Sequence, residues 1–321
     1  MPKAHIIGAG IGGLATALRL RKKGYEVSVF EANPYPGGKL HAIDLGEYRF
    51  DLGPSLFTMP HFVDELFQLF DKPPEQHFKY KRKEILCEYF WDDATRFTAR
   101  KNTRDFARDA AVTFHEKEDA IHSYISRNKK KYDLTAPLFL EQSLHKASTY
   151  TSAKTMKALL STPSLDVFGT LNAVNEKYFE HPKLVQLFNR YATYNGSSPY
   201  LTPGIMSMIP HLEMFYGTFF PEGGMHEIVM SLYRLAVSEG VQFQLDSKVE
   251  EILIDNGNAT ALRIGDTIHN ADLIVSNMDI FPTYRNLLPK QPAPEKTLAQ
   301  ERSSSALIFY WGITKELSLI H

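Results

Sequence analysis

The sequence predicts a mixed α/β fold, with α+β elements, in which strands and helices are interrupted by a long, mainly helical segment. A short apolar run, a glycine-rich turn and an amphipathic run follow one another within residues 4–20. Residues 102–194 have helical periodicity, and strand patterns resume from residue 219. Strands that alternate with helices indicate a parallel sheet. With 321 residues, 43% of them hydrophobic, the chain is long enough for one large domain or two ordinary ones.

The composition argues against nucleic-acid binding and indicates a reducing cellular compartment. Thirty-six basic against thirty-seven acidic residues leave a net charge of −1, so no global field attracts nucleic acid. The single cysteine, Cys87, excludes an internal disulfide and fits a reducing compartment. The most apolar stretch, residues 205–221, contains Pro210, His211 and Glu213, which argues against a membrane span. Because the N-terminus lacks a secretory signal pattern, we expect a cytoplasmic protein.

The first motif is a nucleotide-binding turn at residues 8–13. Gly8 permits a tight turn, Gly10 lets the backbone approach a pyrophosphate, and Gly13 lets the following helix pack against the strand. The positive end of that helix then faces the phosphates. We assign the cofactor to Gly8, Gly10, Ile11, Gly12 and Gly13.

An acidic residue closes the second predicted strand, residues 25–30. Glu31 follows Gly12 by nineteen positions, near the spacing of about twenty at which a carboxylate accepts hydrogen bonds from a ribose diol. A 2′-phosphate would be repelled, so NADP is disfavoured. Glu31 and the adjoining Ala32 join the predicted cofactor site.

The next segment distinguishes FAD from NAD. An NAD domain would continue with a crossover helix, whereas residues 34–39 form a diglycine turn that leads into a predicted hairpin over residues 42–51. The turn is either a simple hairpin entry or, as we predict, a surface beside the pyrophosphate and ribityl chain of FAD. The cofactor positions predicted here are Gly37, Gly38, Lys39, Gly53, Pro54 and Ser55.

The remaining elements suggest a split domain. A helix is predicted from Pro60 and a hairpin over residues 85–99. The basic run at residues 129–131 is interpreted as a solvated helix end or, alternatively, a lipid-headgroup contact. A helix is predicted after Gly224, followed by strands over 241–245, 249–254, 271–276 and 302–312. The predicted domains are residues 1–100 and 216–285 for the cofactor, 101–215 as a helical substrate-domain insertion, and 286–321 as the incomplete start of a second substrate segment.

Two further positions are predicted at strand ends. Val249 begins a strand whose backbone would lie along the adenine, and Asn277 ends a strand at a crevice. An ordinary structural role is the alternative for each.

These motifs together resemble the phytoene desaturase family of carotenoid desaturases. The matching segments are residues 8–14, 37–39, 50–55, 220–225 and 271–277, while 194–200 and 283–289 look like bacterial members that act on carotenes or 1-hydroxycarotenoids. The resemblance implies a Rossmann-like FAD-binding domain split by a mainly helical insertion, and a tunnel for an apolar C40 polyene. It also implies peripheral association with the inner face of the cell membrane and oxygen or a quinone as electron acceptor. The family's second glycine-rich flavin motif would lie beyond His321, so a C-terminally truncated chain is predicted.

The predicted activity is FAD-dependent desaturation of phytoene or a 1-hydroxycarotenoid, with hydride transfer to the flavin. Carotenoid cis–trans isomerisation, amine oxidation and cofactor binding alone are the alternatives. No catalytic residue is assigned, because Glu213, Glu222 and Asp279 are expected to be surface or turn carboxylates. No metal-ligand motif occurs. Residues 205–209 with Phe215, Tyr216, Phe219 and Phe220 line the tunnel or, equally, belong to an ordinary core.

Overall fold

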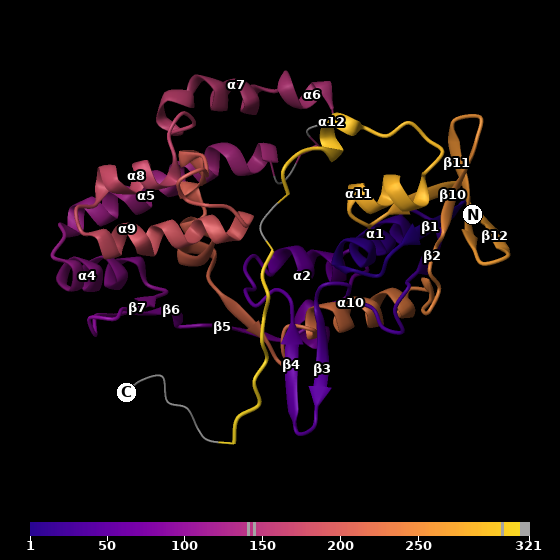
Figure 1. Cartoon of the computed structure of the whole chain (residues 1–321), viewed down its shortest axis with the longest axis horizontal. Helices are drawn as coiled ribbons and strands as arrows, with labels where there is room; N and C mark the ends of the chain where they lie inside the picture. The colour runs from indigo at the N-terminus through magenta and orange to yellow at the C-terminus, as the bar shows by residue number, and fades with distance from the viewer. Residues whose placement is uncertain (140–141, 144–145, 303–304, 315–321) are drawn as a thin grey trace. The chain divides into compact units, whose positions relative to one another are not determined.

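A computed structural model describes residues 1–139, 142–143, 146–302 and 305–314. The chain divides into two compact units (Figure 1). Unit 1 comprises Met1–Lys81, Phe219–Glu301 and a short piece from Ile308 onward. Unit 2 comprises Arg82–Thr218 and a short piece that starts at Arg302. No helix of the described ranges is both long and apolar enough to cross a lipid bilayer.

Unit 1 is built on a four-stranded parallel sheet in the order β13-β1-β2-β9. Its strands are β1 (Lys3–Ile7), β2 (Glu26–Phe30), β9 (Gln242–Gln244) and β13 (Leu273–Ser276). The central strand β1 pairs with β2 on one side and with β13, some 270 residues later, on the other: Ala4 lies opposite both Val27 and Leu273. The predicted parallel sheet is confirmed, and it combines strands from both ends of the chain.

Helices α1 (Ile11–Lys22), α2 (His61–Gln68) and α10 (Glu227–Ser238) pack together beside this sheet. Their contact is apolar: Leu14, Phe67 and Leu232 are almost fully buried in one cluster with the sheet residues Val27 and Val29. Shorter helical segments of unit 1 are α3 (Pro74–His77), α11 (Ile280–Pro282), η5 (Thr283–Leu287) and α12 (Glu295–Leu298).

Antiparallel hairpins complete unit 1. The predicted hairpin after the diglycine turn is β3 (His41–Leu45) with β4 (Tyr48–Leu52). Strands β10 (Glu251–Asp255), β11 (Asn258–Ile264) and β12 (Thr267–Asn270) form a second small sheet. Asn256 and Gly257 both have positive φ angles, as a tight turn between twisted strands requires. Strands β5 (Tyr80–Arg82) and β8 (Phe219–Pro221) form a further pair.

Unit 2 is mainly helical, as the periodicity of residues 102–194 predicts. It opens with the hairpin β6 (Ile85–Phe90) and β7 (Arg96–Arg100), and Asn102 then caps α4 by accepting hydrogen bonds from the N–H groups of Arg104 and Asp105. In Figure 1, α4, α5, α8 and α9 lie alongside one another. The helical segments are α4 (Thr103–Phe114), α5 (Glu118–Phe139), α6 (Ala147–Tyr150), α7 (Ala153–Leu160), η1 (Thr162–Ser164), α8 (Leu171–Tyr178), α9 (Pro182–Asn189), η2 (Arg190–Asn195), η3 (Gly204–Met208) and η4 (Leu212–Tyr216).

The basic run at residues 129–131 is not a solvated helix end. It lies in the middle of α5, and Lys131 is 1% exposed. The Lys131 ammonium is 2.6 Å from a carboxylate oxygen of Asp166 and donates to Ser207 Oγ at 2.6 Å. A buried charge requires a partner. The ion pair with Asp166 attaches α5 to the segment before α8, and the hydrogen bond to Ser207 attaches it to η3. The solvated interpretation was therefore wrong for Lys131.

The strand predicted over residues 302–312 is absent from the described part of that segment. Residues 305–314 contain no strand, and the side chains of Leu307, Phe309 and Trp311 are exposed. A side chain contacts this segment, since Tyr48 Oη donates a hydrogen bond to Ile313 O at 2.9 Å. A β-prone sequence forms a strand only where a partner edge is available.

The core of unit 1 can be tested in α10. Leu232 is fully buried between α1 and the sheet, so Leu232→Ala should lower the free energy of unfolding by about 2–5 kcal/mol. Val237 lies on the exposed side of the same helix, and Val237→Ala should change it by less than about 0.5 kcal/mol. Urea denaturation of both variants measures the difference, and similar losses in the two would contradict the packing.

Acid sensitivity is expected in unit 2. Burial lowers the pKa of His211 from 6.5 to about 4, beside the rings of Tyr132 and Phe215. Between these two values the unfolded chain binds a proton that the folded chain does not. The free energy of unfolding should therefore fall as the pH falls through this window, by up to about 1.4 kcal/mol per pH unit.

Replacing His211 should flatten this dependence. In His211→Gln, the loss of stability between about pH 6.5 and about pH 4.5 should be smaller than in the unmodified protein, as measured by urea denaturation at each pH. His61→Gln, at an exposed position, is measured in the same way as a control for the exchange of His for Gln. Equal slopes in all three proteins would show that His211 does not contribute.

Candidate cofactor site

The glycine turn between β1 and α1 leaves no room for side chains. Gly8 has a φ of +96° and donates its N–H to Phe30 O at 2.8 Å, which joins the ends of β1 and β2. A Cβ on Gly13 would lie 2.1 Å from Gly8 O, and one on Gly12 would lie 2.5 Å from Asn277 Oδ1. The first turn of α1 contains no acidic residue. The start of α1 is thus a close-packed, electropositive surface suited to phosphate.

Glu31 lies at the carboxyl end of β2 and is held in place from two sides. Its Oε2 accepts a hydrogen bond from Ala9 N at 2.8 Å, and its Oε1 accepts from the backbone N and the side-chain Nδ2 of Asn33 at 2.9 and 2.8 Å. The residue is 6% exposed. Its carboxylate therefore has a fixed orientation next to the glycine turn.

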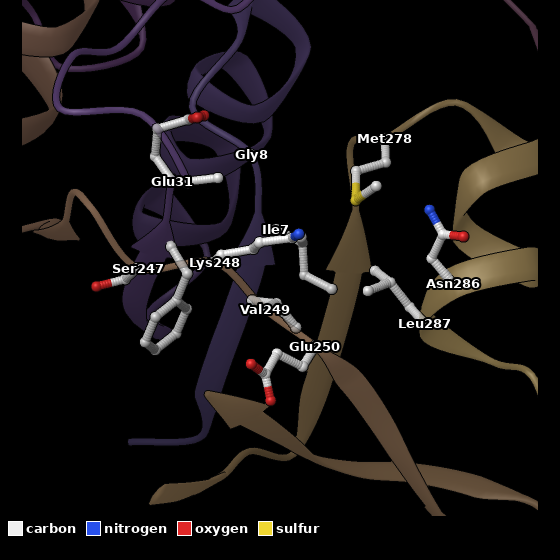
Figure 2. A pocket seen from close by; sticks show the side chains of 12 residues that line it. Ile7, Gly8, Glu31, Ser247, Lys248, Val249, Glu250, Met278, Asn286 and Leu287 are labelled. Atoms are coloured by element: carbon white, nitrogen blue, oxygen red, sulfur yellow. The ribbon is translucent and has the colours of Figure 1, made fainter. Parts of the chain in front are cut away.

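A cavity of about 430 Å³ opens beside Glu31 (Figure 2). In Figure 2, Met278 and Leu287 lie on one side of the cavity and Glu31 on the other. This volume is within the range of small-molecule sites. The lining residues are Ile7, Gly8, Phe30, Glu31, Ala32, Ser247, Lys248, Val249, Glu250, Met278, Asn286 and Leu287.

Sequence reasoning placed Glu31, Ala32, Gly8 and Val249 at this cavity's lining but missed several neighbours. The predicted strand from Val249 begins only at Glu251, so Val249 contributes from the loop before β10. Ile7 and Phe30 could have been found, because ligands bind at the carboxyl ends of parallel strands. Asn286 and Leu287 come from η5, whose approach to the sheet has no local sequence signal.

Asn277 lies over the glycine turn rather than in the cavity. Its N–H donates to Ile7 O at 2.9 Å, which extends the pairing of β13 with β1 by one residue. Its side-chain amide nitrogen is 3.1 Å from the point that a Cβ on Gly10 would occupy. The residue is exposed, so its amide is accessible to a ligand on the turn.

The diglycine turn packs directly against the first turn. Gly37 N donates to Ala9 O at 2.9 Å, and Gly37 forms a parallel bridge with Gly10. Both Gly37 and Gly38 have positive φ angles, and a Cβ on Gly37 would lie 2.3 Å from Leu40 O. Lys39 is exposed, and within the described ranges no carboxylate forms an ion pair with it. A cation is therefore available beside two phosphate-compatible turns.

The segment of residues 53–55 folds back onto this surface. A Cβ on Gly53, whose φ is +86°, would lie 1.9 Å from Lys39 O. Pro54 and Ser55 follow and are exposed. The structure thus brings the predicted residues into two adjoining groups: the cavity with Glu31, Ala32 and Val249, and the glycine surface. The second group consists of Gly8, Gly10, Ile11, Gly12, Gly13, Gly37, Gly38, Lys39, Gly53, Pro54, Ser55 and Asn277.

One of the three candidate carboxylates is buried, although a surface or turn position was expected for it. Glu213 was expected at the surface or in a turn, but it is 1% exposed in unit 2. It accepts hydrogen bonds from Arg190 Nη2 at 2.8 Å, Tyr191 Oη at 2.9 Å and Tyr194 Oη at 2.5 Å. Hydrogen bonds from these three residues of η2 take the place of hydration at the Glu213 carboxylate. The local sequence around Glu213 does not reveal these partners.

The other two carboxylates are where they were expected. Glu222 is about half exposed and pairs with Lys81 at 3.1 Å. Asp279 caps the short helix α11 by accepting a hydrogen bond from Phe281 N at 2.8 Å. Among the described residues, no three His, Cys, Asp or Glu side chains are grouped so as to hold a metal ion.

The fold and the site define a dinucleotide-binding protein. The cavity beside an acidic residue suits a nucleoside, and the side-chain-free turns and Lys39 suit a pyrophosphate. The sequence matches the family described as flavin containing amine oxidoreductase over residues 11–309. The chain belongs to this family, and FAD is accordingly its cofactor.

The chain is also similar to enzymes of carotenoid metabolism, which confirms the predicted resemblance to carotenoid desaturases. It is 58% identical to a 1-hydroxycarotenoid 3,4-desaturase from a Flavobacterium species, over 98% of the chain and 64% of the relative. It is 31% identical to a 4,4'-diapolycopene oxygenase from a Methylomonas species (97% and 62%) and 30% identical to a carotenoid 3,4-desaturase from Haloarcula japonica (96% and 62%). The chain therefore spans less than two thirds of the length of these relatives.

Solved structures share the fold. An oxidoreductase from Methanosarcina mazei matches with a TM-score of 0.61 at 21% identity, over 92% of this chain and 63% of that one. A putrescine oxidase matches with a TM-score of 0.62 at 16% identity, over 92% and 62%. The mixed α/β architecture with its parallel sheet is thus that of flavin amine oxidases.

The glycine turn can be tested by a single methyl group. In Gly13→Ala the new Cβ meets a backbone oxygen that cannot move without displacing β1, so the purified full-length protein should retain less than about a tenth of its flavin. Gly169→Ala is the control, because a Cβ there meets nothing within 4 Å. Flavin absorbance per protein measures retention and circular dichroism checks folding. Full flavin content in Gly13→Ala would show that the turn does not bind the pyrophosphate.

Proposed function

We propose that the protein is an FAD-dependent desaturase that removes two hydrogen atoms from a C–C single bond of a C40 carotenoid, with a 1-hydroxycarotenoid as substrate. The supporting observation is the 58% identity to a 1-hydroxycarotenoid 3,4-desaturase, which extends over 98% of the chain. Phytoene is the other substrate compatible with the motifs.

The reaction depends mainly on how the protein positions the cofactor and the substrate, and the site residues suit that task. When bound, FAD supplies the hydride acceptor. Glu31 would accept hydrogen bonds from the ribose, the turns at residues 8–13 and 37–38 would hold the phosphates, and Lys39 would neutralise their charge. An unactivated C–C bond offers no acidic or basic group, so the protein mainly has to hold it still and exclude water.

No residue of this chain is assigned as a base. Glu213 was one candidate, but three donors occupy its oxygens, and Arg190 is also fixed by donating from Nε to Tyr89 Oη at 2.9 Å. A carboxylate held in this way stabilises the packing of η2 against η4. Removal of Glu213 is expected to affect folding rather than proton transfer.

We further propose that unit 2 forms the substrate domain and contacts a membrane. Three of its apolar side chains, Leu160, Phe168 and Leu201, are more than 80% exposed, which is unfavourable in water and favourable against lipid. The predicted tunnel residues differ in environment: Ile209 is buried in the unit 2 core, whereas Phe215 is 56% exposed and available to an apolar partner. The proposed location is the cytoplasmic face of the cell membrane, with oxygen or a quinone as electron acceptor.

Anaerobic turnover of the full-length holoenzyme tests the activity. Mixed with a 1-hydroxycarotenoid, the flavin should lose its visible absorbance in proportion to a product lighter by two hydrogen atoms. An isomerase would instead give a product of unchanged mass and leave the flavin oxidised. That result, or the absence of any product from both a 1-hydroxycarotenoid and phytoene, would contradict the proposal.

Amine oxidation is the second candidate, favoured by the family description and by the shared fold with putrescine oxidase. The same anaerobic assay with putrescine discriminates between the two. We expect no bleaching by the amine, and rapid bleaching by putrescine with none by a carotenoid would reverse the assignment.

A further inference from the structure

The end of strand β4 is hydrogen-bonded to the turn at residues 223–226, which is far away in the sequence. Asp51 Oδ2 accepts a hydrogen bond from Met225 N at 2.7 Å, and Oδ1 accepts one from His226 N at 3.2 Å. From the same strand, Arg49 Nη1 donates to Gly223 O at 2.7 Å. Both N–H donors lie at the start of α10, whose own N-cap residue, His226, forms no side-chain cap. Asp51 therefore caps this helix from 174 residues away, where a negative charge also suits the helix dipole.

The glycine pair of the turn is matched to this carboxylate. A Cβ on Gly224 would lie 2.4 Å from Asp51 Oδ2 and 3.0 Å from Arg49 Nη1. Both Gly223 and Gly224 also have φ angles above +90°, which other residues rarely adopt. Gly224 is thus explained by its contact with the hairpin, since no side chain fits between it and Asp51, whereas Gly223 is explained by its φ angle alone.

The hydrogen bonds of Asp51 lie close in sequence to the glycine surface that is proposed to bind the cofactor. If the cavity at Glu31 holds the adenosine half of FAD, the rest of the cofactor would lie along Gly10, against which Gly37 and Gly38 are packed. From Gly38 the chain runs into β3, returns along β4 and reaches Gly53, whose backbone contacts Lys39 O. Asp51 is two residues before Gly53. Lys39 and Gly53, which would face the flavin half, thus lie at the base of a hairpin that Asp51 anchors.

Other contacts of the hairpin are aromatic or single: the His41 ring lies 5.2 Å from that of His226, the Phe50 ring 5.5 Å from that of Tyr310, and Tyr48 donates to Ile313 O. The hairpin is a two-stranded sheet with exposed outer residues such as Leu45 and Glu47, and an isolated pair of strands is only marginally stable. We propose that Asp51 is a positioning residue for the cofactor. By binding the start of α10, it fixes the hairpin base, and with it Lys39 and Gly53, in the arrangement that binds the flavin half of FAD.

Asp51 variants of the full-length protein test this role. Asp51→Ala removes two charge-assisted hydrogen bonds and should raise the dissociation constant for FAD at least about tenfold, with Asp51→Asn intermediate. The fine structure of the visible flavin band should also be lost, because the ring environment becomes heterogeneous. Gly224→Ala, which pushes a methyl group into the carboxylate, should reproduce both effects.

Glu47→Gln is the matched control, because it removes the same charge from the exposed tip of the same hairpin. It should leave FAD affinity and spectrum unchanged. A purely structural role predicts a lower melting temperature of the apoprotein with unchanged FAD affinity and spectrum in Asp51→Asn, and that result would overturn the proposal. If Asp51→Ala does not fold, the Asp51→Asn measurements decide. No carotenoid is used, so this outcome is independent of the desaturase assignment.

Discussion

The contact on which unit 1 depends is the packing of the β1–α1 turn, where the first helix touches the end of the first strand. Gly13 has no Cβ to separate α1 from Gly8 O, and Gly12 has none to exclude the side chain of Asn277. Any side chain at these positions would lift α1 away from the sheet, together with Leu14 and Leu18, which form part of the core. The electropositive start of α1 would move with it.

This local constraint becomes a global one because Asn277 comes from the far end of the chain. Strand β13 has to pair with β1 for Asn277 to reach the glycines, and β9 has to pair with β2 for Glu31 N to donate to Gln244 O at 2.9 Å. The N-terminal strands alone would leave both edges of the sheet unpaired. Asp51 adds a third connection between the same two halves, through the start of α10. The cofactor surface therefore forms only when residues separated by the whole of unit 2 come together.

This organisation explains what the sequence could predict. The turns, hairpins and helices of unit 1 follow from short-range patterns, and the strand predicted over residues 25–30 does end immediately before Glu31, beside the glycine turn. The errors concern residues whose environment is set by distant partners. The run at 307–311 has strand-forming residues but no partner edge in the described structure, while Lys131 and Glu213 look like surface charges until Asp166 and Arg190 are placed beside them. Amphipathic periodicity reports which face of a helix is apolar, not which polar residue will find a buried partner.

Unit 2 combines buried ion pairs in its interior with exposed apolar side chains on its surface. Charged residues lie inside, at Lys131 with Asp166 and at Glu213 with Arg190, whereas Leu160, Phe168 and Leu201 lie outside. Buried ion pairs add little net stability compared with apolar packing, but they fix geometry, since a displaced partner leaves an uncompensated charge. Exposed apolar groups, in contrast, are stable only against another apolar phase. This combination of an interior fixed by charges and a partly apolar surface is the basis on which unit 2 is proposed as the membrane-contacting substrate domain.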